Sequence, residues 1–215
     1  MRQLLLDFTR APEPTFENFV HGGNEELVHA LHAAAQGRPA ERVIYLWGEN
    51  GAGKSHLAHA FRRAIEGGGR GEALGRGMRV VDGVEALDDD AQAELFNAFV
   101  SRELEFLLVT AASAPRDLAL RRDLVTRLAS GLTYRVLPLT DQEKRAALAA
   151  HSRVRGFELS EEVASYLLTH ARRDMGSLVS ALDAIDQYSL ETRRAVTVPL
   201  LKAAMGNEGR GPANG

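Results

Sequence analysis

The most constraining feature of this chain is the segment 48–55, which reads GENGAGKS and fits the P-loop pattern G-x-x-x-x-G-K-[ST]. Residues 43–47 before it are β-branched, aromatic or otherwise apolar, which is typical of a buried strand. Residues 55–64 after it contain neither Pro nor Gly and favour a helix. A strand, a glycine-rich loop and a helix in this order bring backbone N–H groups and a helix N-terminus around a phosphate. The segment therefore predicts a nucleotide-binding site, against the alternative of a chance glycine-rich turn.

Two side chains of this loop carry the expected chemistry. Lys54 places a positive charge on the β- and γ-phosphates, and the Ser55 hydroxyl ligates Mg²⁺. The residues expected to contact the nucleotide are Gly48, Asn50, Gly51, Ala52, Gly53, Lys54, Ser55 and His56. The 7 His residues show no H-E-x-x-H spacing, so we expect no metal site built from protein ligands alone. We interpret these His residues as surface or partly buried helix residues.

Length and composition exclude several classes of protein. A chain of 215 residues suits one large domain, or a core with a small second domain. A net charge of −3 does not indicate an extended nucleic-acid-binding face, so we expect no direct sequence-specific DNA binding. The chain has no Cys, which excludes disulfides and Cys-ligated metals. No apolar run is long enough for a membrane span and the start does not resemble a signal peptide, so we expect a cytoplasmic protein.

Residues 14–138 show strands that alternate with helices. The expected strands are 43–47, 78–82, 105–110 and 132–137. The expected helices, besides that of the P-loop, are one capped by Asn24 and running to about Gln36, one starting at Asp88, and one covering 118–128. This alternation predicts an α/β fold with a mostly parallel sheet. A glycine-rich stretch at 67–77 predicts a flexible connection.

Residues 139–205 show only helical signals. Thr140 and Glu143 form a capping-box pattern, Ser160 precedes a second helical pattern, and a third runs from about Asp174. A short last helix is expected at 198–205. This part predicts a small helical lid domain. It lies between the P-loop domain and a Gly- and Asn-rich tail at 206–215 that we expect to be disordered.

Further candidate residues follow the second and third expected strands. Asp82 ends the second strand, where an acid can hold Mg²⁺ through water, although it could be an ordinary turn residue. Gly83 occupies the next position, where a second acid would polarise the attacking water. Glu85 is interpreted as a solvated turn acid. Thr110 and Ser113 are candidates for sensing the γ-phosphate, but polar residues are also common at strand ends.

Two arginines are candidates for phosphate contacts, because the guanidinium is planar and permanently charged. Arg127 lies between apolar residues near a helix end and could project toward the nucleotide of a neighbouring subunit. Arg173 lies at the start of a lid helix and could reach the nucleotide, although the adjacent Arg172 could fill the same role. The alternative for each is a solvated or salt-bridged surface residue.

Taken together, these segments resemble the AAA+ ATPases, and most closely the bacterial regulators related to the replication initiator DnaA. The similarity covers nearly the whole chain. It is carried by the P-loop with the preceding YLWG and by QLLLDF at 3–8, PTFENFV at 14–20, RLASGL at 127–132, RGFEL at 155–159 and RDM at 173–175. The fold implied is a P-loop AAA+ core followed by a helical lid.

The resemblance implies roles for matching residues. Phe19 and Val20 would lie near the adenine of ADP or ATP, Arg127 would be an arginine finger acting in trans, and Arg173 would be a sensor arginine. The residues that resemble a peptide binding the DNA polymerase III sliding clamp (its β subunit) are Gln3, Leu4, Leu6 and Phe8. Residues 1–13 would then be the clamp-binding peptide and its linker. Without the resemblance, a frayed or self-packed N-terminus would be the simpler interpretation.

The chain departs from the family pattern at two places. Between residues 64 and 78, relatives place a further strand and helix where this chain has a Gly-rich connection, so the sheet is expected to have four or five strands. Gly83 is unfavourable for robust hydrolysis of the chain's own ATP. We also expect this chain to lack the DNA-binding domain that the initiator has.

These observations favour a regulator that binds ADP or ATP with Mg²⁺, docks on the sliding clamp and stimulates hydrolysis of DnaA-bound ATP, which prevents re-initiation. The alternatives are a self-hydrolysing AAA+ ATPase, such as a helicase-loader-like protein, and a scaffold with a vestigial P-loop. The intact Lys54 and Ser55 speak against the scaffold. The expected partners are DnaA and the clamp, with a homo-oligomer possible and no membrane partner.

Overall fold

The computed structural model describes residues 13–67 and 77–205. Within these ranges the chain divides into two compact units, residues 14–139 and the residues from 140 onward. The clamp-peptide residues, most of the Gly-rich connection and the tail at 206–215 lie outside the described ranges.

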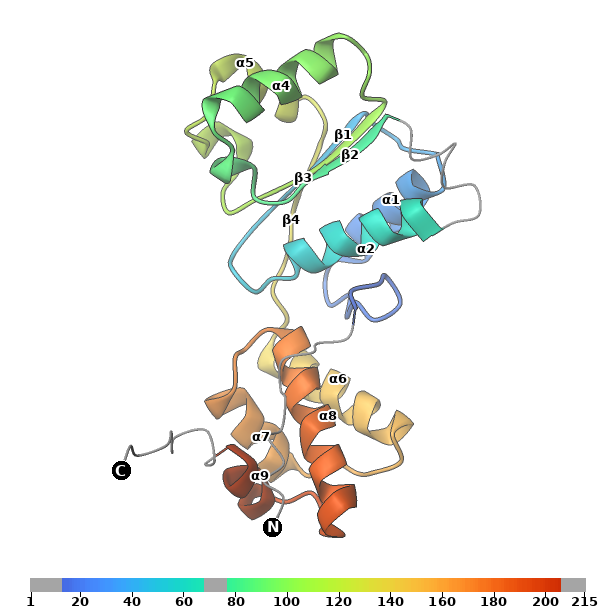
Figure 1. The fold of residues 1–215 in the computed structure, drawn as a ribbon, viewed down its shortest axis with the longest axis vertical. Coiled ribbons are helices and arrows are strands. Elements are labelled where there is room, and N and C mark those ends of the chain that lie inside the picture. The colour runs from blue at the N-terminus through green and yellow to red at the C-terminus, as the bar shows by residue number, and fades with distance from the viewer. Residues whose placement is uncertain (1–12, 68–76, 206–215) are drawn as a thin grey trace, which may run out of the picture. The chain divides into compact units, whose positions relative to one another are not determined.

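The first unit is built around a parallel sheet of four strands within the described residues (Figure 1). Its order is β2-β3-β1-β4, with bounds β1 Val43–Trp47, β2 Met78–Val81, β3 Phe106–Ala111 and β4 Leu132–Arg135. The P-loop strand β1 pairs with β3 on one side and with β4 on the other. The expectation of a mostly parallel sheet is confirmed, and β1 lies at an interior position of it.

Helices cover both faces of this sheet (Figure 1). Alternate residues of β1 pack on opposite sides: Ile44 and Leu46 lie in one hydrophobic cluster, Val43 and Tyr45 in another. The helices of the unit are α1 Glu25–Ala35, α2 Lys54–Gly67, α4 Asp89–Val100 and α5 Arg122–Leu128. The first two cover the Ile44 side and the last two the Tyr45 side. Burial on both faces explains the continuous apolar runs of β1 and β3.

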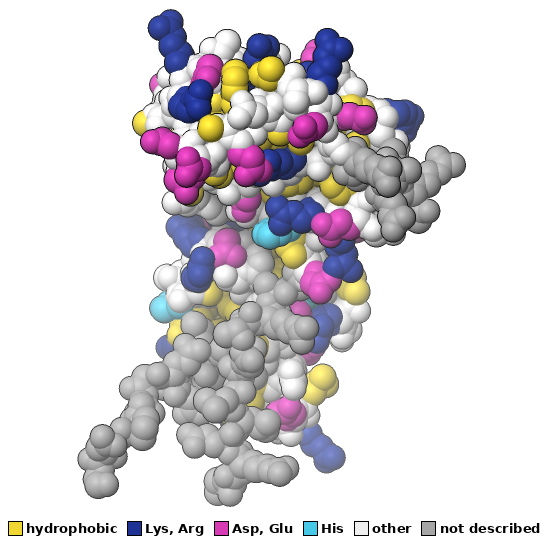
Figure 2. Space-filling model, turned by 45° about the horizontal axis from the view of Figure 1, so that its top comes forward, with side chains coloured by type: hydrophobic (Ala, Val, Ile, Leu, Met, Phe, Trp, Pro, Cys, Tyr) yellow, Lys and Arg dark blue, Asp and Glu magenta, His cyan; other side chains and the backbone are white. Residues whose placement is uncertain are grey.

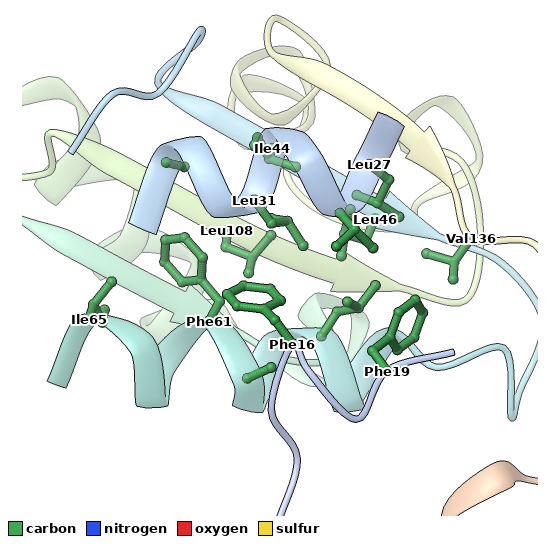
Figure 3. Close-up of a cluster of buried hydrophobic side chains, with 14 of the residues drawn as sticks. Phe16, Phe19, Leu27, Leu31, Ile44, Leu46, Phe61, Ile65, Leu108 and Val136 are labelled. Atoms are coloured by element: carbon green, nitrogen blue, oxygen red, sulfur yellow. The ribbon is translucent and has the colours of Figure 1, made fainter. Parts of the chain in front are cut away.

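The cluster beneath α1 and α2 reaches the P-loop. It contains Phe61 from α2, Leu31 from α1 and Leu108 from β3, and it also contains Phe16 and Phe19 from the segment before α1 (Figure 3). The segment that precedes the first helix is therefore part of the core of this unit.

Two local expectations in the first unit are wrong. Asn24 lies at the N-terminus of α1 but its side chain does not cap the helix. Instead, its amide group donates to the carbonyl oxygen of Leu137 and accepts from the N–H of the same residue, at 3.0 and 2.8 Å. In addition, the expected helix at 118–128 begins only at Arg122, after the short 3₁₀ helix η2 at Pro115–Asp117. The Arg121 N–H donates to the Gln92 side chain of α4, and this contact ends the non-helical stretch.

The second unit is helical throughout its described residues. Its helices are α6 Asp141–Val154, α7 Glu161–His170, α8 Met175–Thr192 and α9 Val198–Met205, and they enclose their own apolar core. The expected helix starts are confirmed. Thr140 and Glu143 form both bonds of the capping box, and the Ser160 and Asp174 side chains accept backbone N–H groups of α7 and α8.

Two further features of the described residues are the hydropathy of the helices and the distribution of surface charge. No helix in the described part of the chain is long and apolar enough to cross a membrane. On the face of the described residues drawn in Figure 2, basic and acidic side chains are interspersed, as the small net charge would suggest.

Candidate nucleotide-binding site

The P-loop joins the end of β1 to the start of α2 through glycines that other residues could not replace. Gly48 and Gly53 have φ values of +149° and +104°. A Cβ on Gly48 would lie 2.7 Å from the carbonyl oxygen of Val136, and one on Gly53 would lie 2.7 Å from Cε2 of Phe19. The loop backbone therefore passes too close to its neighbours for any side chain at these positions. What remains is a cradle of main-chain groups at the start of α2, which fits a phosphate.

Lys54 is the first residue of α2, and its side chain folds over the loop. The ammonium group donates to the carbonyl oxygens of Gly48 and Glu49, at 2.8 and 2.9 Å. Burial lowers the pKa of Lys54, and the carboxylates of Glu85 and Asp82 act in the opposite direction. The positive charge thus lies beside the loop and is stabilised by the charges of two acids, and a phosphate would add a further anionic partner.

Ser55 and Asp82, the two residues expected to be associated with Mg²⁺, are brought together. Ser55 is in the first turn of α2 and Asp82 follows β2, and the Ser55 hydroxyl donates to Asp82 Oδ1 at 3.1 Å. A hydroxyl and a carboxylate are oxygen ligands of the kind that Mg²⁺ prefers. Within the described ranges, no cluster of three or more His, Cys, Asp or Glu could hold a metal ion. The pair therefore fits an ion that takes its remaining ligands from water and phosphate.

Thr110, a candidate phosphate sensor, makes different contacts. Its side chain is buried near the end of β3, and its hydroxyl donates to Asp82 Oδ1 at 2.5 Å. The same hydroxyl accepts the N–H of Gly83 at 2.8 Å. The structure thus connects Thr110 with the acid at the end of β2, which the sequence did not suggest, because 27 positions separate it from Gly83.

Glu85 is exposed, as expected of a turn acid, and it also contacts the end of β3. It lies in the 3₁₀ helix η1 at Val84–Ala86, and its Oε1 accepts the N–H of Ala112 just after β3, at 2.9 Å. Its charge opposes the lowering of the Lys54 pKa.

Ser113, the second sensor candidate, uses its carbonyl oxygen to accept a hydrogen bond from the Tyr45 hydroxyl at 2.8 Å. Burial, followed by the charge of Glu85, raises the pKa of Tyr45.

Phe19 and His56 support the loop from the side of α1 and α2. Phe19, which packs in the cluster drawn in Figure 3, is only 9% exposed. Its ring centroid lies 5.4 Å from that of His56. His56 Nε2 lies 2.9 Å from the carbonyl oxygen of Thr15, and burial lowers the His56 pKa. Val20, the other residue expected near the adenine, is half-buried. The Phe19 ring therefore packs under Gly53 and in the core.

Arg127 lies in α5 on the opposite face of the sheet from α2. Its side chain is exposed, and its guanidinium carbon lies 6.0 Å from the centroid of the Phe99 ring. Among the described residues, no carboxylate forms an ion pair with Arg127, whereas the nearby Arg121 pairs with Asp123 at 2.8 Å. The structure thus presents Arg127 as a charged donor group without an acidic partner from the described part of its own chain.

Arg173 is placed in an ion pair within the helical unit. One of its terminal nitrogens lies 2.5 and 2.7 Å from the two carboxylate oxygens of Asp141, at the start of α6. The hydrogen bond from Arg173 lowers the pKa of Asp141. The neighbouring Arg172 instead faces Asp174 at 3.4 Å. In this structure Arg173 is therefore salt-bridged, which is the alternative that the sequence analysis gave for it.

Comparisons with known proteins agree with this fold. The family model for the bacterial DnaA ATPase domain matches residues 11–73, and the model described as Hda, lid domain, matches residues 141–205. Domain III of the Thermotoga maritima replication initiation protein DnaA has a TM-score of 0.71 at 20% identity, covering 91% of this chain and 97% of that one.

Two further solved structures show the same architecture. AMPPCP-bound DnaA from Aquifex aeolicus has a TM-score of 0.66 at 21% identity, over 84% of this chain and 67% of that one. The Holliday junction branch migration motor RuvB from Thermotoga maritima has a TM-score of 0.63 at 16% identity, over 95% of this chain and 73% of that one.

The parallel sheet, the P-loop and the helical unit together define a protein with the AAA+ nucleotide-binding fold. Both family models then place it more narrowly. With the likeness to DnaA domain III, these matches support an Hda-like, DnaA-related AAA+ protein.

Proposed function

We propose that this chain is a regulator of replication initiation that stimulates hydrolysis of DnaA-bound ATP and so prevents re-initiation. The observation that carries the proposal is the exposed Arg127 on α5, which has no ion pair with any described carboxylate. A guanidinium already paired with an acid would be partly neutralised, whereas an unpaired one can bind the phosphate oxygens of another subunit. An arginine offered in trans stabilises charge that develops in the transition state, and can be worth ~10³–10⁵ in rate.

The chain would hold an adenine nucleotide, ADP or ATP, in its own P-loop. Lys54 and the main-chain cradle would bind the phosphates, and Ser55 with Asp82 would hold Mg²⁺ partly through water. When bound, the ion would neutralise phosphate charge. The AMPPCP complex of Aquifex aeolicus DnaA, a protein of the same fold, supports an ATP-like ligand.

The regulator would act in the cytoplasm on DnaA while docked on the DNA polymerase III sliding clamp. The docking peptide would be Gln3, Leu4, Leu6 and Phe8, which belong to the undescribed N-terminus. An extended peptide with apolar side chains for a groove and one Gln for a polar pocket suits this kind of contact. Its support is the likeness of the chain to Hda and to DnaA.

A self-hydrolysing ATPase is a second candidate, and Glu85 favours it. This carboxylate is fixed at the edge of the site by the N–H of Ala112 and acts on Lys54. It could take the place of the second acid, whose position in the sequence is occupied by Gly83. The regulator is the better proposal because the second unit matches the Hda lid model, and because Gly83 occupies the position where an acid would polarise the attacking water.

One set of ATP turnover assays separates the two candidates. Turnover is measured for this chain alone, for DnaA alone, and for both together with clamp loaded on DNA. We expect fast turnover only in the complete mixture. Fast turnover by this chain alone would identify the self-hydrolysing ATPase, and deletion of residues 1–8 should abolish both clamp capture and stimulation.

Arg127→Ala tests the trans contact, and Arg122→Ala on the same exposed helix is the matched control. We expect Arg127→Ala to lower stimulated turnover ~10³-fold or more, because the phosphates of DnaA lose their charged donor. The melting temperature, nucleotide affinity and clamp binding should stay close to those of the wild type. The control should keep full stimulation. A well-folded Arg127→Ala protein that stimulates normally would refute the finger.

A further inference from the structure

We propose that Thr110 is a positioning residue for the Mg²⁺ of this site, and that it acts by fixing the carboxylate of Asp82. This inference rests on the proposed binding of a nucleotide with Mg²⁺. Two hydrogen bonds carry it: from the Thr110 hydroxyl to Asp82 Oδ1 at 2.5 Å, and from the Gly83 N–H to the same hydroxyl at 2.8 Å.

The hydrogen-bonding capacity of a hydroxyl decides between positioning and phosphate sensing. A Thr hydroxyl has one hydrogen to donate, and an ionised carboxylate can only accept. In its contact with Asp82, Thr110 must therefore be the donor, and its lone pair receives the Gly83 N–H. No hydrogen is left for a phosphate oxygen. The side chain is also 1% exposed, so it has little access to a ligand.

Asp82 needs such support because it is exposed at the end of β2. One of its oxygens receives hydroxyl donors from two other elements, Ser55 at the start of α2 and Thr110 near the end of β3. The Thr110 bond comes from the buried side and holds the carboxylate in one orientation. Residues that orient metal-associated groups in this way typically change metal affinity 10–100-fold when removed.

Thr110→Val tests the inference, because valine keeps the shape of the side chain and lacks the hydroxyl. Thr110→Ser is the matched control, because it keeps the hydroxyl. The measurement is the affinity for ADP by calorimetry, once with Mg²⁺ and once with EDTA. We expect Thr110→Val to reduce the gain in ADP affinity due to Mg²⁺ by about 10–100-fold. Affinity without Mg²⁺ should be unchanged, and Thr110→Ser should behave as the wild type.

A double-mutant cycle shows whether Thr110 acts through Asp82. In an Asp82→Asn background, Thr110→Val should have little further effect on the Mg²⁺ dependence, because both changes remove the same interaction. Additive effects would overturn the inference. A Thr110→Val protein that keeps the full Mg²⁺ dependence would also overturn it, as would an equal loss of ADP affinity with and without Mg²⁺. If the wild type binds no nucleotide, the proposed function itself fails.

Discussion

Replacing Gly53 by Ala should destabilise the P-loop. The backbone at Gly53 has φ +104°, a conformation that residues with a side chain rarely adopt. In addition, the new Cβ would lie 2.7 Å from Cε2 of Phe19, well inside van der Waals contact. The Phe19 ring is 9% exposed and packed in the core, so it has little room to move.

The expected loss of stability follows from these two effects. A residue held in a sparsely populated backbone region costs about 1–3 kcal/mol. Overpacking by a methyl group in a well-packed region costs about 1–3 kcal/mol more. The sum is about 2–6 kcal/mol. At 2–4 °C per kcal/mol for a chain of this size, the melting temperature should fall by roughly 4–24 °C.

Gly83→Ala is the matched control, because Gly83 also has a positive φ, +73°, but a Cβ there meets nothing within 4 Å. The control should lose only the conformational cost, about 1–2 kcal/mol. Calorimetric melting of both variants and of the wild type gives the comparison, and ADP titration shows whether the cradle still binds. We expect Gly53→Ala to lose nucleotide affinity as well as stability.

The close approach of Phe19 can be tested separately from the backbone conformation. In a Phe19→Leu background the ring is gone, so Gly53→Ala should destabilise less than it does in the wild type. Equal melting temperatures for Gly53→Ala and Gly83→Ala would refute the role of the Phe19 contact. An unchanged effect in the Phe19→Leu background would refute it too.

Two further predictions concern Phe99 and His56. Phe99→Leu should weaken DnaA stimulation while nucleotide affinity stays normal, because Arg127 loses the ring that lies 6.0 Å from its guanidinium carbon. The same ring lies 4.5 Å from the guanidinium carbon of Arg42. Turnover assays check the weaker stimulation, and Phe96→Leu on the same helix should stimulate normally. Burial lowers the pKa of His56 below its ordinary 6.5, so the unfolded chain binds the proton more readily. The contribution of neutral His56 to the free energy of unfolding is therefore present in full above pH 6.5. It is lost as the pH falls through the lowered pKa. Between about pH 7.5 and about pH 5.5, the melting temperature of the wild type should fall more than that of His56→Gln, and equal falls would contradict this.

Features set by neighbouring residues were the ones that the sequence predicted well. The strand before the P-loop, the helix after it and the capping box at Thr140 each depend on side chains within a few positions. The sequence also brought Ser55 and Asp82 to one edge of the sheet, because parallel strands and P-loop geometry leave little choice. Local physics was sufficient for these elements.

Errors arose where a polar side chain has a partner far along the chain. Asn is a common helix-capping residue, but the side-chain amide of Asn24 bonds both backbone groups of Leu137, 113 positions away, and the carbonyl oxygen of His21. The sequence offers Thr110 as a candidate phosphate sensor or as an ordinary strand-end residue, and it does not predict the hydrogen bonds of Thr110 to Asp82 and Gly83 after β2. Several partners can satisfy one amide or hydroxyl, and only the packing of the elements decides which one is in reach.

Under the proposed function, the nucleotide of this chain would be a structural ligand more than a substrate. The P-loop follows β1, and residues of β1 on the other face pack in one cluster with Leu124 and Leu128 of α5. The same helix carries Arg127. A ligand bound only to the folded state stabilises it by about 2.7 kcal/mol at a hundred times its Kd. Bound nucleotide would therefore stabilise the strand against which the Arg127 helix packs. A site that holds its nucleotide without turning it over would keep that support in place.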